Sequence, residues 1–176
     1  MEEKTLVTLA KSGDKKAFVT LYACYKERLY RYAFYRLGNR DDAEDAVSDC
    51  ILQAWAGIAS LKKTEAFSPW LFRILYCSCT TIIKAQALRR QMKNIDDSEF
   101  DLVGSLDSTI EKTELLEALG QLKAQEQEIV LLSVIMGFNS KEIAKITDST
   151  SAAVRSKLSR SLKKMRVFME GSNNEQ

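Results

Sequence analysis

The sequence predicts an all-α fold: two small helical domains joined by a flexible acidic linker, the second domain containing a helix-turn-helix. The 176 residues include seven Gly and one Pro, and this scarcity favours long helices over a turn-rich β fold. Apolar residues recur at steps of three and four, as in amphipathic helices. An acidic stretch near the middle marks a boundary. We expect domains over residues 1–90 and 110–170, a linker over 91–109 and a disordered tail over 171–176.

The first two helices are predicted over residues 14–37 and 40–55. The first carries an aromatic stripe that we interpret as core-facing, and Gly38-Asn39 ends it, because both residues tolerate the left-handed conformation that closes a helix. The second crowds acidic residues into its first turns, where the helix dipole favours them. Asp49 and Gln53 lie beyond that turn, so this polar side is either a solvated face or a surface for a basic protein partner.

A third helix is predicted to begin at Ser68-Pro69-Trp70, with Ser68 as its cap and Pro69 in the first helical position. Aromatic and basic residues then alternate with apolar ones, after a loop that holds Lys62 and Lys63. Unstacked single-stranded bases require this combination of ring faces and cations. The aromatic residues cannot all face one way, so some must belong to the core.

The linker prediction rests on composition. From Asn94 to Glu117 there are eight acidic residues and one Lys, without helical periodicity in the first part. On these residues alone the segment is a solubilising connector.

The last domain ends in a basic helix. Apolar runs predict helices around residues 115–122 and 129–135, and Asn139 with Glu142 resembles a capping box ahead of a short helix. Thr150 or Ser151 caps the final helix. Its inward stripe is predicted to comprise Val154, Leu158, Leu162 and Met165. From Lys141 to Arg166 there are eight Lys or Arg against two acidic residues, although the net charge of the chain is +2. Such a helix fits the DNA major groove, and the alternative is a solvated basic helix.

The bulk composition argues against catalysis and against membrane insertion. The chain has no His, so the commonest general base is missing, and we expect no enzymatic activity, small-molecule substrate, cofactor or metal site. Its four cysteines (Cys24, Cys50, Cys77 and Cys79) are predicted to be free and buried. No apolar run approaches the roughly 20 residues of a membrane span, and the N-terminus is too polar for a signal peptide. We therefore expect a cytoplasmic protein.

Four segments in this order resemble an extracytoplasmic-function sigma factor of bacterial RNA polymerase. They are FVTLYACYKERLYRYAFYRLGNRDDAEDAVSDCILQAW, FSPWLFRI, EQEIVLLSVIMGFNSKEIAKI and VRSKLSRSLKKMR. The resemblance runs from about Ala17 to Arg166 and is more specific than a lone helix-turn-helix. It implies a protein that performs no chemistry and gives RNA polymerase its choice of promoter. Such a protein binds promoter DNA both as a duplex and after the strands have melted.

The resemblance also implies three sets of site residues. The clamp helices of the largest core polymerase subunit would bind Arg40, Asp42, Glu44, Asp45, Asp49 and Gln53. The minus-10 element would be bound and melted by Lys62, Lys63, Phe67, Trp70, Arg73, Tyr76 and Lys84. The minus-35 element would be read by Ser151, Arg155, Ser156, Lys157, Ser159, Arg160, Lys163 and Lys164. The acidic linker would thread polymerase channels that nucleic acid otherwise occupies. An anti-sigma factor, often membrane-anchored, would hold the protein inactive, in some cases at the inner face of the membrane.

Some positions depart from the family pattern. Cys77, Thr81 and Lys84 stand where Asn, Asp and Arg are common, and Thr147-Asp148 replaces the usual Leu-Gly. Ser48 stands where Gln is usual.

The sequence leaves two other functions open. A free-standing helix-turn-helix repressor would bind a palindromic duplex tightly without polymerase. A helical adaptor or anti-anti-sigma protein would show no salt-dependent affinity for DNA.

Overall fold

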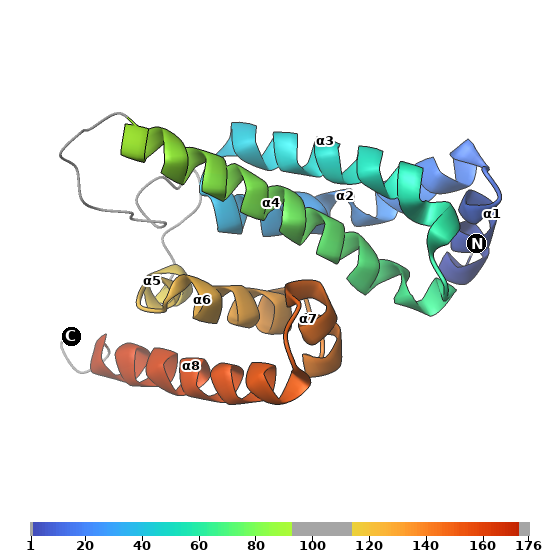
Figure 1. Cartoon of the computed structure of the whole chain (residues 1–176). Helices are drawn as coiled ribbons and strands as arrows, with labels where there is room; N and C mark the ends of the chain where they lie inside the picture. Colours follow the sequence, from blue (N-terminus) through green and yellow to red (C-terminus); the bar gives the residue numbers. More distant parts are fainter. Residues whose placement is uncertain (1, 93–113, 173–176) are drawn as a thin grey trace. The chain divides into compact units, whose positions relative to one another are not determined.

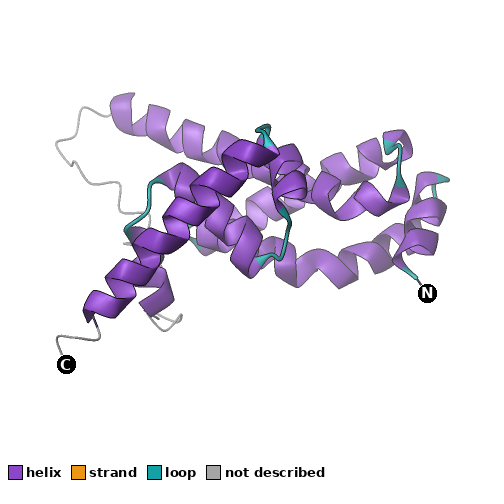
Figure 2. Cartoon of the chain, turned by 90° about the horizontal axis from the view of Figure 1, so that it is seen from below, coloured by secondary structure: helices purple, strands orange, loops and turns teal. Residues whose placement is uncertain are grey.

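The structure is a computed structural model that describes residues 2–92 and 114–172, and every regular element in these ranges is helical, as predicted (Figures 1 and 2). The elements are α1 (Glu3–Lys11), α2 (Lys15–Leu37), α3 (Arg40–Gly57), the 3-10 turns η1 (Ile58–Ser60) and η2 (Thr64–Ala66), α4 (Phe67–Met92), α5 (Glu114–Gly120), α6 (Ala124–Val130), the π-helical turn η3 (Leu131–Ile135), α7 (Ser140–Thr147) and α8 (Ser151–Ser172). The chain divides into two compact units, an N-terminal unit with α1 to α4 and a C-terminal unit with α5 to α8.

The predicted linker and the predicted tail each overlap the end of a helix in the structure. Most of the predicted linker, including its acidic cluster, lies outside the described residues. Its first two positions belong to α4, which ends at Met92. The helix α8 likewise continues to Ser172, into the segment predicted as a tail.

The N-terminal unit is a bundle in which α2, α3 and α4 lie side by side, with α3 antiparallel to both neighbours (Figure 1). The core contains fully buried large side chains, among them Leu29, Tyr32 and Phe72. The Tyr32 and Phe72 rings meet edge to face, with centroids 5.7 Å apart. This packing leaves the outer faces of α3 and α4 for other partners.

The first two predicted helices begin and end close to the expected residues, and specific caps explain why. The Asp14 carboxylate accepts hydrogen bonds from the backbone N–H of Lys16 and Ala17 at the start of α2. Gly38 closes α2 with a positive φ of 77°. Asn39 then caps α3 by accepting from the N–H of Asp42 at 2.9 Å, so Asn39 starts a helix as well as following one.

The helix α1 was not predicted from the sequence. Its buried residues are Leu6, Val7 and Ala10, and it packs against α2 and the η1–η2 region. Tyr25 in α2 donates a hydrogen bond to the Glu3 carboxylate at 2.9 Å. Burial, with a contribution from Glu3, raises the pKa of Tyr25 to about 12, so this hydroxyl remains a donor at neutral pH.

The start of α4 differs from the prediction that Ser68 would be its cap. Phe67 already has helical backbone angles and η2 precedes it, so Ser68 lies inside the helix. Pro69 falls in the first turn, where backbone N–H groups have no intrahelical acceptor and its missing N–H costs nothing. By length and composition α4 could cross a membrane, a test that core helices also meet. Because Leu71, Phe72, Leu75 and Cys79 are buried, we interpret α4 as a core helix.

The cysteines divide into two classes, so the prediction that all four are buried is wrong for two of them. All four are free, with Cys50 and Cys79 buried and Cys24 and Cys77 exposed. Burial raises the pKa of Cys50 to about 12, which keeps it a thiol. The exposed pair lie on the outer faces of α2 and α4, which the apolar periodicity of those helices leaves to solvent.

The C-terminal unit contains the predicted helix-turn-helix, formed by α7 and α8. Asn139 and Glu142 make the expected capping box, in which each side chain accepts the other residue's backbone N–H. Thr150 caps α8 by accepting from the N–H of Ala153 at 3.2 Å, which decides between the two predicted caps. Asp148 closes α7 in the left-handed conformation, with φ 55° and ψ 50°.

Substitution of Asp148 tests the turn between α7 and α8. A left-handed residue other than Gly costs roughly 1–2 kcal/mol, of which Asp recovers part by local hydrogen bonding. We expect Asp148→Gly to raise the free energy of unfolding of the C-terminal unit by about 0.5–1 kcal/mol, and Asp148→Val to lower it. Chemical denaturation of both variants measures the difference. Equal stabilities would show that this turn imposes no such requirement.

Candidate functional site

The residues of α3 that are predicted to contact polymerase lie outside its buried stripe. They fall on three different rows along the helix, which we call lines. Because the helix turns once every 3.6 residues, Asp41, Asp45, Ser48 and Leu52 form the line opposite the buried stripe. All four are exposed, and Leu52 retains 72% of its accessible surface in the middle of this acidic face. Sequence reasoning missed Leu52, although its spacing of seven residues from Asp45 and four from Ser48 could have identified it.

Asp42, Asp49 and Gln53 lie on a second line, beside α4. The Asp42 carboxylate accepts from the Gln86 side chain, and the Asp49 carboxylate accepts from Ser78 at 2.6 Å and from Gln53 at 2.7 Å. Three of the predicted docking residues therefore also connect α3 to α4.

Arg40 and Glu44 form the third line. Arg40 Nε donates to Glu44 at 2.9 Å in an ion pair of exposed side chains one helical turn apart. Such a pair stabilises a helix by about 0.3–0.5 kcal/mol. Its charges largely offset each other, so these two residues add less to the acidic field than Asp41 and Asp45 do.

The outer face of α4 brings together Trp70, Arg73, Cys77 and Lys84, which recur at steps of three, four and seven. Cys77 and Lys84 are exposed, whereas Trp70 and Arg73 are half-buried. The loop before α4 adds the exposed cations Lys62 and Lys63, whereas the neighbouring Leu61 is buried. This face, which we call the α4 cationic face, combines an aromatic ring with side-chain cations.

Phe67 and Tyr76 lie elsewhere. Phe67 is 1% exposed and packs edge to face on Tyr25, with its ring centroid 6.0 Å from that of Trp70. Phe67 therefore supports Trp70 from below rather than presenting a face of its own. Tyr76 lies on the flank toward α2, where the Arg36 guanidinium sits 4.3 Å above its ring centroid.

Arg36 is a second residue that sequence reasoning missed. Its guanidinium donates to the Tyr32 hydroxyl and to Thr80 Oγ1, both at 2.9 Å. The contact with Thr80 joins α2 to α4 across 44 residues of the chain, and no periodic signal in the sequence points to it.

The predicted residues of α8 separate into an outer face and a flank. Arg155, Ser156, Ser159, Arg160 and Lys163 are exposed. Lys157 and Lys164 instead reach the start of α6, where Lys157 donates to Gln125 at 2.8 Å and Lys164 pairs with Glu126 at 2.7 Å. Ser151, the first residue of α8, is half-buried.

Leu162 corrects the predicted inward stripe of α8. It is 41% exposed, whereas Ser161 is fully buried and donates to the Lys157 carbonyl at 2.8 Å. The helical repeat aligns residues 154, 158, 161 and 165, so a buried Ser occupies the position that the sequence pattern assigned to Leu.

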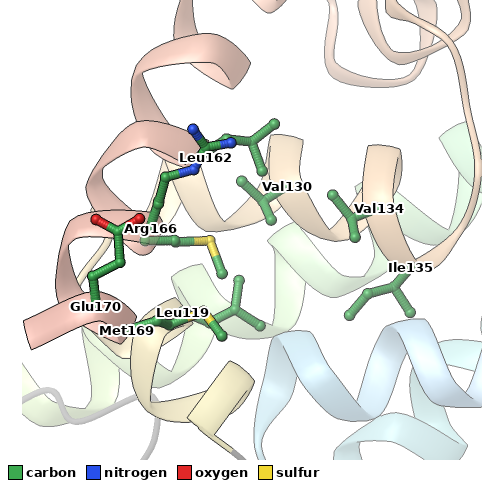
Figure 3. Close-up of a pocket in the computed structure, with 9 residues that line it drawn as sticks. Leu119, Val130, Val134, Ile135, Leu162, Arg166, Met169 and Glu170 are labelled. Atoms are coloured by element: carbon green, nitrogen blue, oxygen red, sulfur yellow. The ribbon is translucent and has the colours of Figure 1, made fainter. Parts of the chain in front are cut away.

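Leu162 lines an apolar groove on a flank of α8 (Figure 3). By the helical repeat, this flank differs from the one that carries Lys157 and Lys164. The groove has a volume of about 420 Å³, and Val130, Val134 and Ile135 form its other wall. Arg166 and Glu170 lie at its rim. Because its walls are aliphatic, the groove is unsuited to phosphate, and the polar outer face of α8 remains the nucleic-acid candidate.

The two halves of the chain match the models of two regions of one protein family. Residues 21–92 match Sigma-70 region 2, and residues 112–165 match Sigma-70, region 4. The chain is 28% identical over 158 residues to RNA polymerase sigma factor SigV of Bacillus subtilis, covering 89% of this chain and 93% of that protein. It is 27% identical to the ECF RNA polymerase sigma-E factor of Haemophilus influenzae, with 91% of each chain covered.

Solved structures share the fold. The structure of CnrH in complex with the cytosolic domain of CnrY superposes with a TM-score of 0.72 at 22% identity, covering 96% of this chain and 97% of that one. The same TM-score of 0.72 is found for the sigma factor RpoE in complex with the anti-sigma factor NepR from Bartonella quintana. This match covers 88% of this chain and 98% of that one, at 22% identity.

The Lys164–Glu126 pair gives a pH-dependent prediction. The hydrogen bond from Lys164, followed by that from the Lys123 backbone, lowers the pKa of Glu126 below its ordinary value of 4.5. A lowered pKa stabilises the fold above the unfolded-state value, and this contribution is lost as the pH falls through the folded-state value. We expect Glu126→Gln to lower the free energy of unfolding by less than about 1 kcal/mol at pH 7. Denaturant titrations should show the difference vanishing as the pH falls through the lowered pKa of Glu126; a difference that persists once the carboxylate is protonated contradicts the pairing.

Proposed function

Because the chain belongs to the sigma-70 family of bacterial transcription initiation factors, we propose that α3 docks on core RNA polymerase while α4 and α8 engage the promoter. The protein thereby directs promoter-specific initiation as an extracytoplasmic-function sigma factor, and it acts in the cytoplasm. It supplies binding surfaces, whereas polymerase supplies the chemistry. One observation carries the assignment of surfaces: the acidic and cationic faces lie on different helices, each within a segment that matches a sigma-70 region.

The docking surface that we propose for polymerase is the outer side of α3. Asp41 and Asp45 lie on its exposed line, and Asp42, Asp49 and Gln53 border it. A basic partner surface would be steered to these carboxylates, which set the association rate and the orientation of docking more than the affinity. The clamp helices of the largest polymerase subunit are the proposed partner.

The α4 cationic face is proposed to hold the melted minus-10 element. Trp70 offers a ring on which an unstacked base can stack, and Lys62, Lys63, Arg73 and Lys84 provide cations for phosphates. Stacking returns about 1–3 kcal/mol per base, which is comparable to the few kcal/mol that flipping a base costs. Phe67 supports Trp70, and Tyr76 reaches DNA together with Arg36.

The outer face of α8 is proposed to read the duplex minus-35 element. Arg155, Arg160 and Lys163 can contact guanine edges or phosphates, and Ser156 and Ser159 can donate to either. Ser151 at the helix start is proposed to contact a phosphate. Lys157 and Lys164 contribute mainly through their contacts with α6.

We also propose that an anti-sigma factor regulates the protein, because one solved structure of the same fold is a sigma factor RpoE in complex with the anti-sigma factor NepR. An inhibitor that covers the α3 face or the α4 cationic face would block polymerase or promoter. A membrane-anchored inhibitor would in addition hold the protein at the inner face of the membrane.

Transcription from a promoter library tests the proposal against a repressor or an adaptor. Purified protein is mixed with core polymerase and the library, and the transcription start sites are mapped. We expect initiation at a defined set of promoters that depends on added protein. Unaltered core activity, or tight binding of a palindromic duplex without polymerase, contradicts the assignment.

Lys163 and Lys164 provide a matched pair on α8. We expect Lys163→Gln to reduce the slope of log affinity against log salt for duplex DNA by about one, because a phosphate contact is lost. Lys164 is paired with Glu126, so Lys164→Gln should change this slope by less than half as much. Fluorescence anisotropy at several salt concentrations measures both slopes. Equal losses would show that Lys164 leaves Glu126 to bind DNA.

Cys77 reports on the α4 cationic face without any mutation. In the holoenzyme we expect promoter opening to slow maleimide alkylation of Cys77 by roughly tenfold or more, because melted DNA covers this thiol. Cys24 on α2 is also exposed and serves as the internal control, while Cys50 and Cys79 are buried. Mass spectrometry of the labelled peptides gives both rates. Unchanged reactivity of Cys77 on promoter addition would place the melted strand elsewhere.

A further inference from the structure

We propose that Ser78 and Gln86 of α4 are positioning residues for polymerase docking, because each orients one carboxylate of α3 toward the polymerase. This inference rests on the proposed function of the α3 face. It assigns a role in polymerase affinity to two side chains of the helix that carries the promoter contacts.

The first contact joins Asp49 to Ser78, 29 residues apart in the chain. Ser78 is 4% exposed and donates its hydroxyl to Asp49 Oδ2 at 2.6 Å, whereas Asp49 itself is exposed. Gln53 Nε2 donates to the same Oδ2 at 2.7 Å and lies 3.5 Å from Ser78 Oγ. A buried donor of fixed position thus holds one oxygen of an exposed carboxylate.

The second contact lies about two turns away and joins two half-buried side chains. Gln86 donates to Asp42 Oδ2, and Asn39 donates to the same oxygen. The N–H of Asp42 donates to Asn39 Oδ1 at 2.9 Å, which fixes the carboxylate to the start of α3. Both carboxylates therefore use Oδ2 to accept from donors that include one from α4.

These contacts suit a docking surface for a basic partner, because the side chains that donate to the two carboxylates are uncharged. Ser78, Gln53 and Gln86 orient the carboxylates without neutralising them, so the negative charges remain for cations of the partner. A side chain that is already ordered loses less conformational entropy on binding. The preorganisation of one such side chain corresponds to about a two- to tenfold change in affinity.

A purely structural role would join α3 to α4 without affecting docking, and a double-mutant cycle separates the two possibilities. The affinity of the full-length protein for core polymerase is measured for Ser78→Ala, Asp49→Ala and the double variant. We expect Ser78→Ala to weaken binding by about three- to tenfold in the natural chain and by less than about twofold when Asp49 is already Ala. The same pattern is expected for Gln86→Ala with Asp42→Ala.

Binding kinetics give a readout that a structural role would not move. Ser78→Ala leaves the charge unchanged, so the association rate should stay within about twofold while dissociation becomes faster. Thr20→Ala is the matched control, because Thr20 on α2 bonds its hydroxyl to the Lys16 carbonyl and not to another helix. Thermal unfolding of each variant confirms that it is folded.

Two outcomes overturn the inference: an affinity of Ser78→Ala equal to that of Thr20→Ala, or the same loss with and without the Asp49 carboxylate. If Asp49→Ala and Asp42→Ala bind polymerase as tightly as the natural chain, the proposed docking face fails instead. The cycle therefore distinguishes failure of this inference from failure of the function on which it rests.

Discussion

The antiparallel packing of α3 on α4 is the constraint on which the functional surfaces depend. Ala43, Ala46, Cys50 and Ala54 are fully buried, and these small side chains allow the two helix backbones to approach closely. The Cys50 thiol donates to the Leu71 carbonyl at 3.6 Å within this interface. Because burial raises its pKa to about 12, the Cys50 side chain carries no charge at neutral pH. A larger or charged residue at these positions would separate the helices and shift both outer faces together.

This packing places the two proposed functions of the N-terminal unit on adjacent helices. The carboxylates of α3 and the cations of α4 belong to one rigid bundle, and polar contacts such as Asp49 with Ser78 connect them. A bundle docked through α3 would therefore present α4 to DNA at a fixed angle. The cationic α8 belongs to the other unit, so the proposed promoter contacts lie in both units and neither α4 nor α8 would have to bind the promoter alone.

The sequence was sufficient to predict the elements that depend on local signals. Apolar periodicity predicted α2, α3 and α8, and the spacing of Asn139 and Glu142 predicted the capping box. The short helix α1 was missed, although its buried residues Leu6, Val7 and Ala10 follow a helical spacing. The cap at Ser68 was wrong, since the preceding 3-10 turn starts the helix earlier than Pro69 suggested.

The candidate site was predictable in its residue types but not in its contacts. The acidic residues of α3 and the cations of α8 are visible in the sequence. Which of them pair internally depends on the register between helices, which local patterns do not encode. The pairing of Lys164 with Glu126, the stacking of Arg36 on Tyr76 and the burial of Phe67 are all of this kind. They decide which charges and rings remain available to a partner.

The affinity of the protein for core RNA polymerase after charge reversal on α3 tests the central claim most directly. Asp45→Arg changes an exposed carboxylate on the docking line, and Glu27→Arg makes the same change in charge on the exposed side of α2. We predict that Asp45→Arg weakens polymerase binding by about tenfold or more, whereas Glu27→Arg leaves it within about twofold. Equal affinities for the two variants would contradict docking through α3.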